Sequence, residues 1–249
     1  MLRNSLSKFF KKPQDYKLWV AMVVPIWVLA GFILAQVIGG LVMLGRRSVG
    51  VSFAGVNEST LQAVFSAVIY VLSLVIVIGI PWWVKKYRTT RQEIGLHTSM
   101  TWTDILLTPL AFVAYILLSY VLTSIASNFP FYDIEQVQNT GFTQLTQGYE
   151  FLLAFLTLVV IAPIAEEILF RGYLLGKLRK HVPVWLAILV TSLLFGLVHF
   201  AWNVGVDVFA LSIVLCLLRI STGRLWPAML LHMAKNGLAF YLLFINPML

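Results

Sequence analysis

Long apolar stretches constrain the fold of this chain more than any other feature of its sequence. Three of them lie in the first half, at 18–45, 61–84 and 105–125. Each is long enough for a helix to cross the hydrocarbon core of a bilayer, which takes about 20 residues. Hydrophobic residues make up 60% of the chain and charged residues 11%. Because lipid offers no hydrogen bonds to the backbone, such stretches span as helices. We therefore predict an all-α fold, a polytopic transmembrane helical bundle.

Four further apolar stretches follow, at 151–180, 183–201, 204–218 and 225–245. The first of these contains charged residues and the third is short. We therefore predict about seven spans, within a range of six to eight. The sequence organises into a basic tail at 1–17, N-terminal transmembrane helices and loops at 18–148, and a C-terminal transmembrane core at 149–249.

Lysine and arginine are distributed unevenly over the predicted loops. They are concentrated in the tail at 1–17, the loop at 85–97 and the stretch at 171–180, whereas the predicted outer loops carry only Arg46 and Arg47. Cytoplasmic loops of membrane proteins carry the excess of positive charge, so we predict a cytoplasmic N-terminus. The net charge of +8 is scattered over short loops. This pattern predicts membrane lipid as a partner and no nucleic acid.

The stretch APIAEEILFRG, at 162–172, places three charged side chains in an apolar segment. Ionisable residues within a membrane are costly and usually face a cavity or a partner, so function is the default hypothesis. Glu167 and Arg171 are spaced to pair along one helical face. Glu166 points about 100° away from Glu167 and has no local partner. We predict that Glu166 is catalytic and that Glu167 and Arg171 are supporting residues, with a plain buried ion pair as the equal alternative for these two.

Two further polar clusters lie in apolar stretches. In SLLFGLVHF, Phe195 and His199 share one helical face, and in HMAKN, His232 and Asn236 do the same. One buried histidine alone would more often be a packing residue, but two histidines and a glutamate indicate a site. A helical hairpin that turns at 181–183 would let Glu166 and His199 face each other. The stretch 201–207 would then be a turn buried within the bundle.

The motifs EExxxR (Glu166, Glu167, Arg171), FxxxH (Phe195, His199) and HxxxN (His232, Asn236) occur here in this order. Together they resemble the CPBP family of intramembrane proteases, which includes CAAX-processing enzymes and the bacteriocin-processing or immunity proteins called Abi. The resemblance covers about 152–243, and QEIGL at 92–96 is similar to a stretch common in that family. It implies an intramembrane endopeptidase that cleaves a membrane-associated protein or leader peptide, with 149–249 as the catalytic core. We expect an integral protein of a bacterial cell membrane.

Peptide hydrolysis needs an activated water and stabilisation of an oxyanion. A desolvated glutamate is suited to proton transfer, so we expect Glu166 with His199 to activate the water. His232 and Asn236 would donate hydrogen bonds to the oxyanion. The resemblance implies the same roles, with Phe195 as a supporting residue. Cys216, the single cysteine, reads as a small buried hydrophobe.

Other chemistries and functions remain open on the sequence. Glu166, His199 and His232 could form the two-His-one-carboxylate set of a catalytic zinc site. No HExxH helix is present, so we favour a metal-independent reaction without a cofactor. The same polar pocket could serve a non-proteolytic immunity or peptide-binding protein. A transporter is weaker, because no half of the chain repeats. Asp207 reads as a turn or helix-cap residue.

Overall fold

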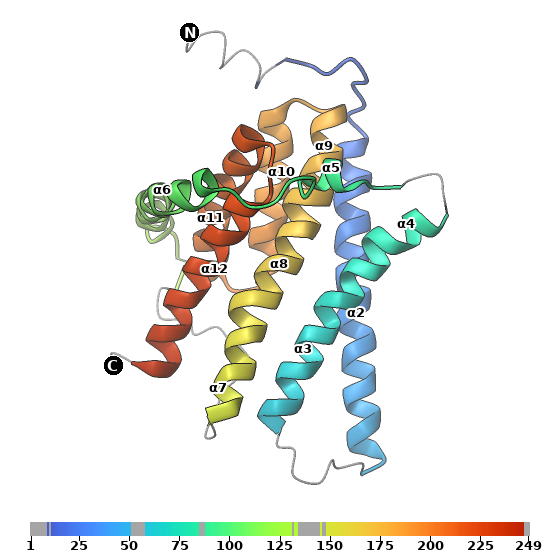
Figure 1. The fold of residues 1–249 in the computed structure, drawn as a ribbon, viewed down its shortest axis with the longest axis vertical. Coiled ribbons are helices and arrows are strands. Elements are labelled where there is room, and N and C mark those ends of the chain that lie inside the picture. The colour runs from blue at the N-terminus through green and yellow to red at the C-terminus, as the bar shows by residue number, and fades with distance from the viewer. Residues whose placement is uncertain are drawn as a thin grey trace. The chain divides into compact units, whose positions relative to one another are not determined.

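The computed structural model describes residues 9, 11–50, 58–84, 88–130, 132–133, 145 and 148–246. Every regular element in this part of the chain is a helix, which confirms the all-α prediction (Figure 1). Among the described residues, six helical stretches are long and apolar enough to cross a membrane: Val20–Ser48, Thr60–Trp83, Trp102–Ala126, Gly148–His181, Trp202–Thr222 and Trp226–Ile245. A shorter apolar helix, Val184–Leu197, adds a seventh hydrophobic segment.

Several spans contain π-helical turns, in which each ring of backbone hydrogen bonds holds one more residue than in an α-helix. The span with the glutamates is the most interrupted, since it passes through two π-helical segments, η2 and η3. In chain order the elements are α2 (Val20–Ser48), α3 (Glu58–Leu74), η1 (Val75–Gly79), α4 (Ile80–Trp83), α5 (Arg91–Ile94), α6 (Trp102–Ala126), α7 (Gly148–Phe155), η2 (Leu156–Ile161), α8 (Ala162–Glu167), η3 (Ile168–Leu174), α9 (Leu175–His181), α10 (Val184–Leu197), α11 (Trp202–Thr222), α12 (Trp226–Phe240) and η4 (Tyr241–Ile245).

The predicted lengths of the fifth and sixth spans are wrong, although the hairpin turn between α9 and α10 is confirmed. α10 ends at Leu197 and α11 begins at Trp202, so the buried turn predicted at 201–207 is wrong: residues 202–207 are helical, and the turn lies a few residues earlier, where Phe200 is 85% exposed. Phe200 in this turn has a φ of 56°, which breaks the right-handed helix. The early turn lets Gly196 and Gly205 meet: a Cβ on Gly196 would lie 2.9 Å from the carbonyl oxygen of Gly205.

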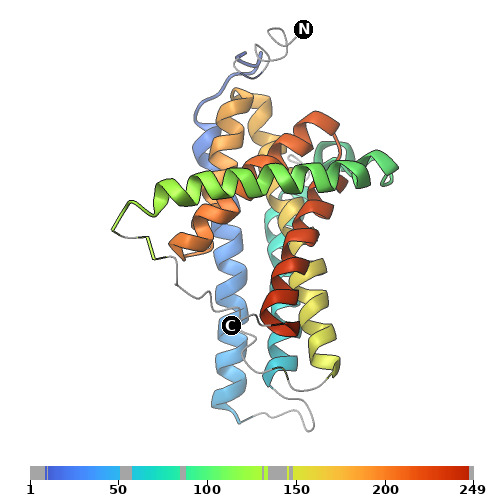
Figure 2. The same cartoon turned by 90° about the vertical axis from the view of Figure 1, so that its left-hand side faces the viewer.

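The contacts divide the chain into two compact units, which are described separately. The first unit consists of 1–29, 89–138 and 167–232. In it α11 packs against both α10 and α6, and Figure 2 shows α6 crossing α11. Its core contains buried residues of α6, α11 and α12: Ala111, Tyr115, Leu211, Val214, Leu215, Leu218, Ala228 and Leu231.

The second unit consists of 30–88, 139–166 and 233–249. Here α3 lies beside α7 and η2 (Figure 1). Small residues allow the close approach, since Ala63 and Ala154 are both buried at the centre of this core. The hydroxyl of Thr157 donates a hydrogen bond of 3.3 Å to the carbonyl oxygen of Ala63 and ties the two helices together.

Part of the predicted topology falls outside the described residues. The orientation rests in part on Arg3, Lys8, Lys85 and Lys86, which the structure does not describe. The cytoplasmic N-terminus and the division into 1–17, 18–148 and 149–249 stay predictions.

Candidate active site

Glu167 is the centre of a buried polar cluster in the first unit. Its Oε1 accepts hydrogen bonds from Nη1 of Arg171 at 2.7 Å and from Nδ1 of His232 at 2.8 Å. Glu167 and Arg171 are 0% exposed and His232 is 3% exposed. The predicted pairing of Glu167 with Arg171 is confirmed, and His232 is an additional partner. Because an arginine-paired carboxylate only accepts hydrogen bonds, Nδ1 of His232 carries the proton in this contact.

The ring of Phe195 packs against the cluster. The guanidinium carbon of Arg171 lies 4.2 Å from its centroid, the geometry of a cation–π contact. The rings of His199 and His232 meet Phe195 edge-on, with centroids 5.1 Å and 5.8 Å away. Phe195 is itself 0% exposed. Members of all three sequence motifs therefore come together around one aromatic ring.

His199 lies in the turn after α10, and its Nδ1 is 2.7 Å from the carbonyl oxygen of Phe195. A carbonyl oxygen can only accept, so Nδ1 is the protonated nitrogen. In the neutral ring the lone pair is then on Nε2, and only this atom can accept a proton. The contact between the two residues of the FxxxH motif thus fixes the tautomer of the histidine, although His199 lies beyond the end of α10.

Glu166 belongs to the second unit and has different partners from its neighbour Glu167. Its Oε1 accepts a hydrogen bond of 2.9 Å from the hydroxyl of Tyr70, on α3. Sequence reasoning missed Tyr70, because the residue belongs to no motif and lies in another span. The only available signal was a hydroxyl within an apolar helix.

Asn236, also in the second unit, fills a gap in the backbone hydrogen bonding of η2. In an α-helix the amide of Ala162 would donate to Leu158, but here it donates to the carbonyl of Thr157. The next amide along would be that of Pro163, which has no N–H. Nδ2 of Asn236 donates to the Leu158 carbonyl oxygen instead, at 2.9 Å. The proline just before the glutamates therefore creates an acceptor that the last motif satisfies.

The predicted site residues are thus divided between the two units. Five lie in the first unit: Glu167, Arg171, Phe195, His199 and His232; Glu166 and Asn236 lie in the second. The predicted facing of Glu166 and His199 stays a prediction. Within the described residues, no three or more His, Cys, Asp or Glu side chains are grouped so that they could hold a metal ion.

The QEIGL stretch belongs to the first unit and packs beside the buried cluster. The guanidinium of Arg219, which is 1% exposed, donates to the carbonyl oxygens of Glu93 at 2.8 Å and Ile94 at 3.2 Å. Gly95 follows with a φ of 92° and ends α5. On the other side, a Cβ on Gly172 would lie 2.7 Å from Cγ2 of Ile94. Because Gly172 is next to Arg171 in η3, this loop packs directly on the helix that carries the cluster.

The side chain of Glu93 adds charge pairing to this loop. It pairs with Lys180, and more distantly with Lys177 at 4.0 Å, both on α9. It also accepts from the amide of Thr90 in a capping box. Burial raises the pKa of Glu93, but the hydrogen bonds from Lys180 and Thr90, together with the positive charges of Lys177 and Lys180, outweigh that effect, so the net pKa is lowered.

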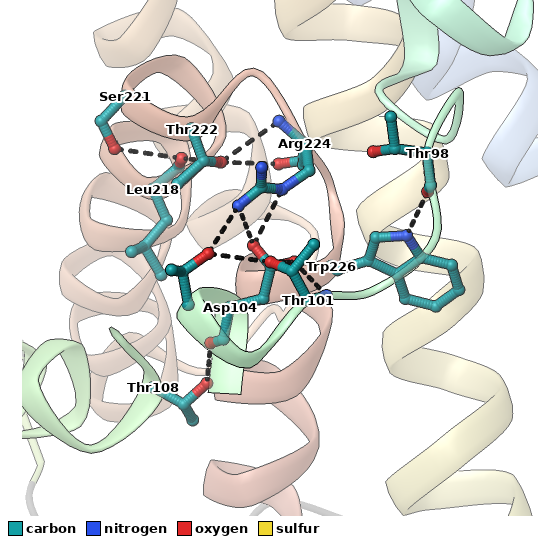
Figure 3. A network of polar contacts seen from close by, with 10 residues as sticks. Thr98, Thr101, Asp104, Thr108, Leu218, Ser221, Thr222, Arg224 and Trp226 are labelled. Atoms are coloured by element: carbon teal, nitrogen blue, oxygen red, sulfur yellow. Dashed lines mark hydrogen bonds and ion pairs between the residues drawn. The ribbon is translucent and has the colours of Figure 1, made fainter. Parts of the chain in front are cut away.

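A second polar network joins the start of α6 to the loop before α12 (Figure 3). Asp104, 0% exposed, accepts from Nη2 of Arg224 at 2.8 Å and from Nε at 3.0 Å. The indole of Trp226 donates to the carbonyl of Thr98. This network holds the α11–α12 turn and so fixes where α12, with His232, begins.

The turn or helix-cap role predicted for Asp207 is wrong. Asp207 lies within α11 and accepts hydrogen bonds from Tyr115 at 2.7 Å and Ser119 at 2.6 Å, both on α6. A partly buried carboxylate among apolar helices is stabilised by such donors. Asp207 therefore links the two helices that form much of the core of the first unit.

These features define a polytopic helical membrane protein whose C-terminal helices bury a glutamate, an arginine and a histidine in contact. Comparison with known families narrows that class. Residues 148–238 match the model of the Rce1-like family, described as "Type II CAAX prenyl endopeptidase Rce1-like". The family resemblance predicted from the three motifs is confirmed over these residues, and it supports a membrane endopeptidase.

A similar sequence occurs in an "Uncharacterized 24.3 kDa protein" of Escherichia coli. It is 35% identical over 92 residues, which cover 35% of this chain and 42% of that protein. The chain thus spans less than half the length of this relative. No solved structure matches the chain.

Proposed function

We propose that this protein is an intramembrane endopeptidase of the CAAX-protease and Abi type, which hydrolyses a peptide bond in a membrane-associated protein or leader peptide. The observation that carries the proposal is the buried contact of Glu167 with Arg171 and His232, inside a segment similar to an endopeptidase family. A buried ion pair rarely stabilises a protein more than apolar side chains would. Moreover, Nε and Nη2 of Arg171 and Oε2 of Glu167 are buried and have no hydrogen-bond partner among the described residues. A cluster that is costly for stability is best explained by function.

In this proposal Glu166 is the general base, and His199 helps to orient the water through Nε2. Glu166 takes one proton from the water as its oxygen attacks the peptide carbonyl carbon. The same proton passes to the leaving amine when the C–N bond breaks, so the carboxylate is restored. A general base placed in this way accelerates such a reaction about 10²–10⁴-fold.

His232 and Asn236 would stabilise the oxyanion, and their observed contacts decide which atoms can do so. Nδ1 of His232 is bonded to Glu167, so the ring can donate to substrate only from Nε2, and only when it is doubly protonated. One N–H of Asn236 is used by Leu158, and the amide has a second N–H for the oxyanion. Each such donor is worth about 2.7–4 kcal/mol.

The test is cleavage of internally quenched peptides by the purified protein in detergent. Glu166→Gln and His199→Gln are each expected to lower kcat at least about 100-fold. Glu150→Gln is the matched control, because Glu150 is another buried carboxylate on the same span, 1% exposed. Its variant should retain activity. Equal losses in Glu150→Gln and Glu166→Gln would contradict the assignment of the base.

Two further arms of the assay separate the remaining alternatives. We propose that the reaction needs no metal, so activity should persist with the chelator phenanthroline. Loss on chelation and recovery with zinc would instead assign Glu166, His199 and His232 to a metal site. Tight peptide binding without turnover in the wild type would favour an immunity or peptide-binding protein. Location in a bacterial cell membrane with a cytoplasmic N-terminus is part of the proposal and is testable by tagging the N-terminus.

A further inference from the structure

We propose that Tyr70 is a positioning residue for Glu166, so that the N-terminal helices contribute to the catalytic machinery. The inference rests on the proposed function, because it concerns the carboxylate that serves there as the base. The hydroxyl of Tyr70 donates a hydrogen bond of 2.9 Å to Oε1 of Glu166. Tyr70 lies outside residues 148–238, the segment that matches the endopeptidase family. The motifs of that segment therefore describe an incomplete site.

The packing of the second unit holds Tyr70 in place. α3 contacts both α7 and η2, and the hydrogen bond from Thr157 to the Ala63 carbonyl fixes their register. Tyr70 follows Ala63 by about two helical turns, and Glu166 follows Thr157 by about two and a half. α3 and the helix with Glu166 thus run in the same direction. Two hydrogen bonds join them, one from Thr157 to the backbone of α3 and one from the phenol of Tyr70 to Glu166.

The small side chains at this contact explain why the phenol reaches the carboxylate. Ala63 is 2% exposed and Ala154 is 0% exposed. Small residues let helix backbones approach closely in a membrane. A larger residue at either position would push α3 away and lengthen the bond between Tyr70 and Glu166.

The chemistry of the phenol suits positioning and not base catalysis. A tyrosine hydroxyl ionises near pH 10, so at neutral pH it remains protonated and donates. Donation to one oxygen fixes the rotation of the carboxyl group, whose terminal torsion is otherwise broad. A base held in one orientation reacts faster, because misplacement by about 1 Å can reduce a rate about 100-fold. Tyr70 thus acts through Glu166 and need not touch substrate.

The first experiment compares Tyr70→Phe with Ser73→Ala in the peptide-cleavage assay. Ser73 is the matched control: it is a buried hydroxyl on the same helix, and its Oγ donates only to the backbone carbonyl of Tyr70, at 2.7 Å. We expect Tyr70→Phe to lower kcat about 10–100-fold, with KM within about twofold of the wild type. Ser73→Ala should keep both constants, and both variants should melt within a few degrees of the wild type.

A second measurement covers the case in which Tyr70→Phe folds poorly. Replacing Tyr70 with 3,5-difluorotyrosine keeps the shape of the ring but makes the phenol more acidic. If the phenol acts on Glu166, kcat should change more than about twofold while KM and the melting temperature stay the same. A role in packing alone would not respond to the acidity of the hydroxyl.

The outcomes separate this inference from the function on which it rests. Active wild type, inactive Glu166→Gln and a fully active Tyr70→Phe would overturn the role of Tyr70 and leave the endopeptidase intact. A kcat that does not change with fluorination would have the same meaning. A wild type that cleaves no peptide, with peptide binding unaffected by Glu166→Gln, would overturn both. A specific loss of kcat in Tyr70→Phe would support both.

Discussion

Replacing Gly95 by alanine tests whether the QEIGL loop is held by Arg219. Gly95 has φ 92° and ψ 23°, a left-handed conformation that alanine adopts at a cost of about 1–2 kcal/mol. A Cβ there would also lie 2.6 Å from Cζ and 2.8 Å from Nε of Arg219. The guanidinium would have to move, although it is buried and bonded to two backbone carbonyls.

The size of the effect follows from those two bonds. A hydrogen bond that involves a charged group contributes about 1.5–3 kcal/mol, so the displacement of Arg219 adds about 3–6 kcal/mol to the backbone cost. Gly223 provides the control, since it has a φ of 69° and no neighbouring atom of the described residues lies within 4 Å of its Cβ position. Gly223→Ala should therefore show the backbone cost alone, about 1–2 kcal/mol.

Thermal unfolding of the purified protein in detergent measures the difference. For a chain of this size, 1 kcal/mol corresponds to about 2–4 °C, so Gly95→Ala should melt at least about 6 °C below Gly223→Ala. In addition, Arg219→Ala combined with Gly95→Ala should be less destabilising than the sum of the two single variants, because the clash is gone. Equal melting temperatures for the two glycine variants, or strict additivity in the double variant, would refute the reasoning.

Three further predictions concern other contacts. Asp104→Asn removes the negative charge of the side chain that accepts two hydrogen bonds from Arg224. This change should lower the free energy of unfolding by about 1.5–3 kcal/mol. A loss below about 0.5 kcal/mol would show that the network in Figure 3 is not stabilising. Asn236→Ala leaves the Leu158 carbonyl without its side-chain donor and should lower the free energy of unfolding by about 1–3 kcal/mol. An unchanged melting temperature would contradict this expectation and would mean that water replaces the amide. The net pKa of Glu93 is lowered in the folded protein. Ionised Glu93 therefore adds to the free energy of unfolding above its unfolded pKa of about 4.3, and this stabilisation is lost as the pH falls through the pKa of Glu93 in the folded protein. The difference in melting temperature between wild type and Glu93→Gln should accordingly narrow between about pH 5 and pH 3, and a constant difference would contradict the charge pairing.

The spans were predictable because apolar length is a local property. The stretches predicted at 18–45, 61–84 and 105–125 correspond to helices that begin and end within a few residues of them. The prediction failed at the end of α10, where the turn at Phe200 and the close contact of Gly196 with Gly205 set the boundary. Apolar residues continue through that turn, so composition alone gives no signal there.

In the candidate site, contacts within one helix could be predicted from the sequence, whereas contacts between helices could not. The pairing of Glu167 with Arg171 follows from helical spacing and is confirmed. The bond from His232 to Glu167 depends on how α12 packs, which no spacing rule provides. Tyr70 could have been noticed as a hydroxyl-bearing residue in an apolar helix. Its hydrogen bond to Glu166 could not have been predicted, because the two residues lie in different helices.

Pro163 carries information that sequence reasoning could have used further. A proline within a helix removes a donor, so some carbonyl one turn earlier needs another partner. The site meets this need with Asn236, a residue expected from its motif to serve the substrate. His232 is similar, since its Nδ1 is bonded to Glu167, so the proposed oxyanion contact would have to use Nε2. In both residues a hydrogen bond within the protein determines which side-chain atom could contact the substrate in the proposed reaction. If the proposed reaction is correct, the motif residues are constrained twice, by the packing of the helices and by the chemistry, and neither constraint can be read from their spacing alone.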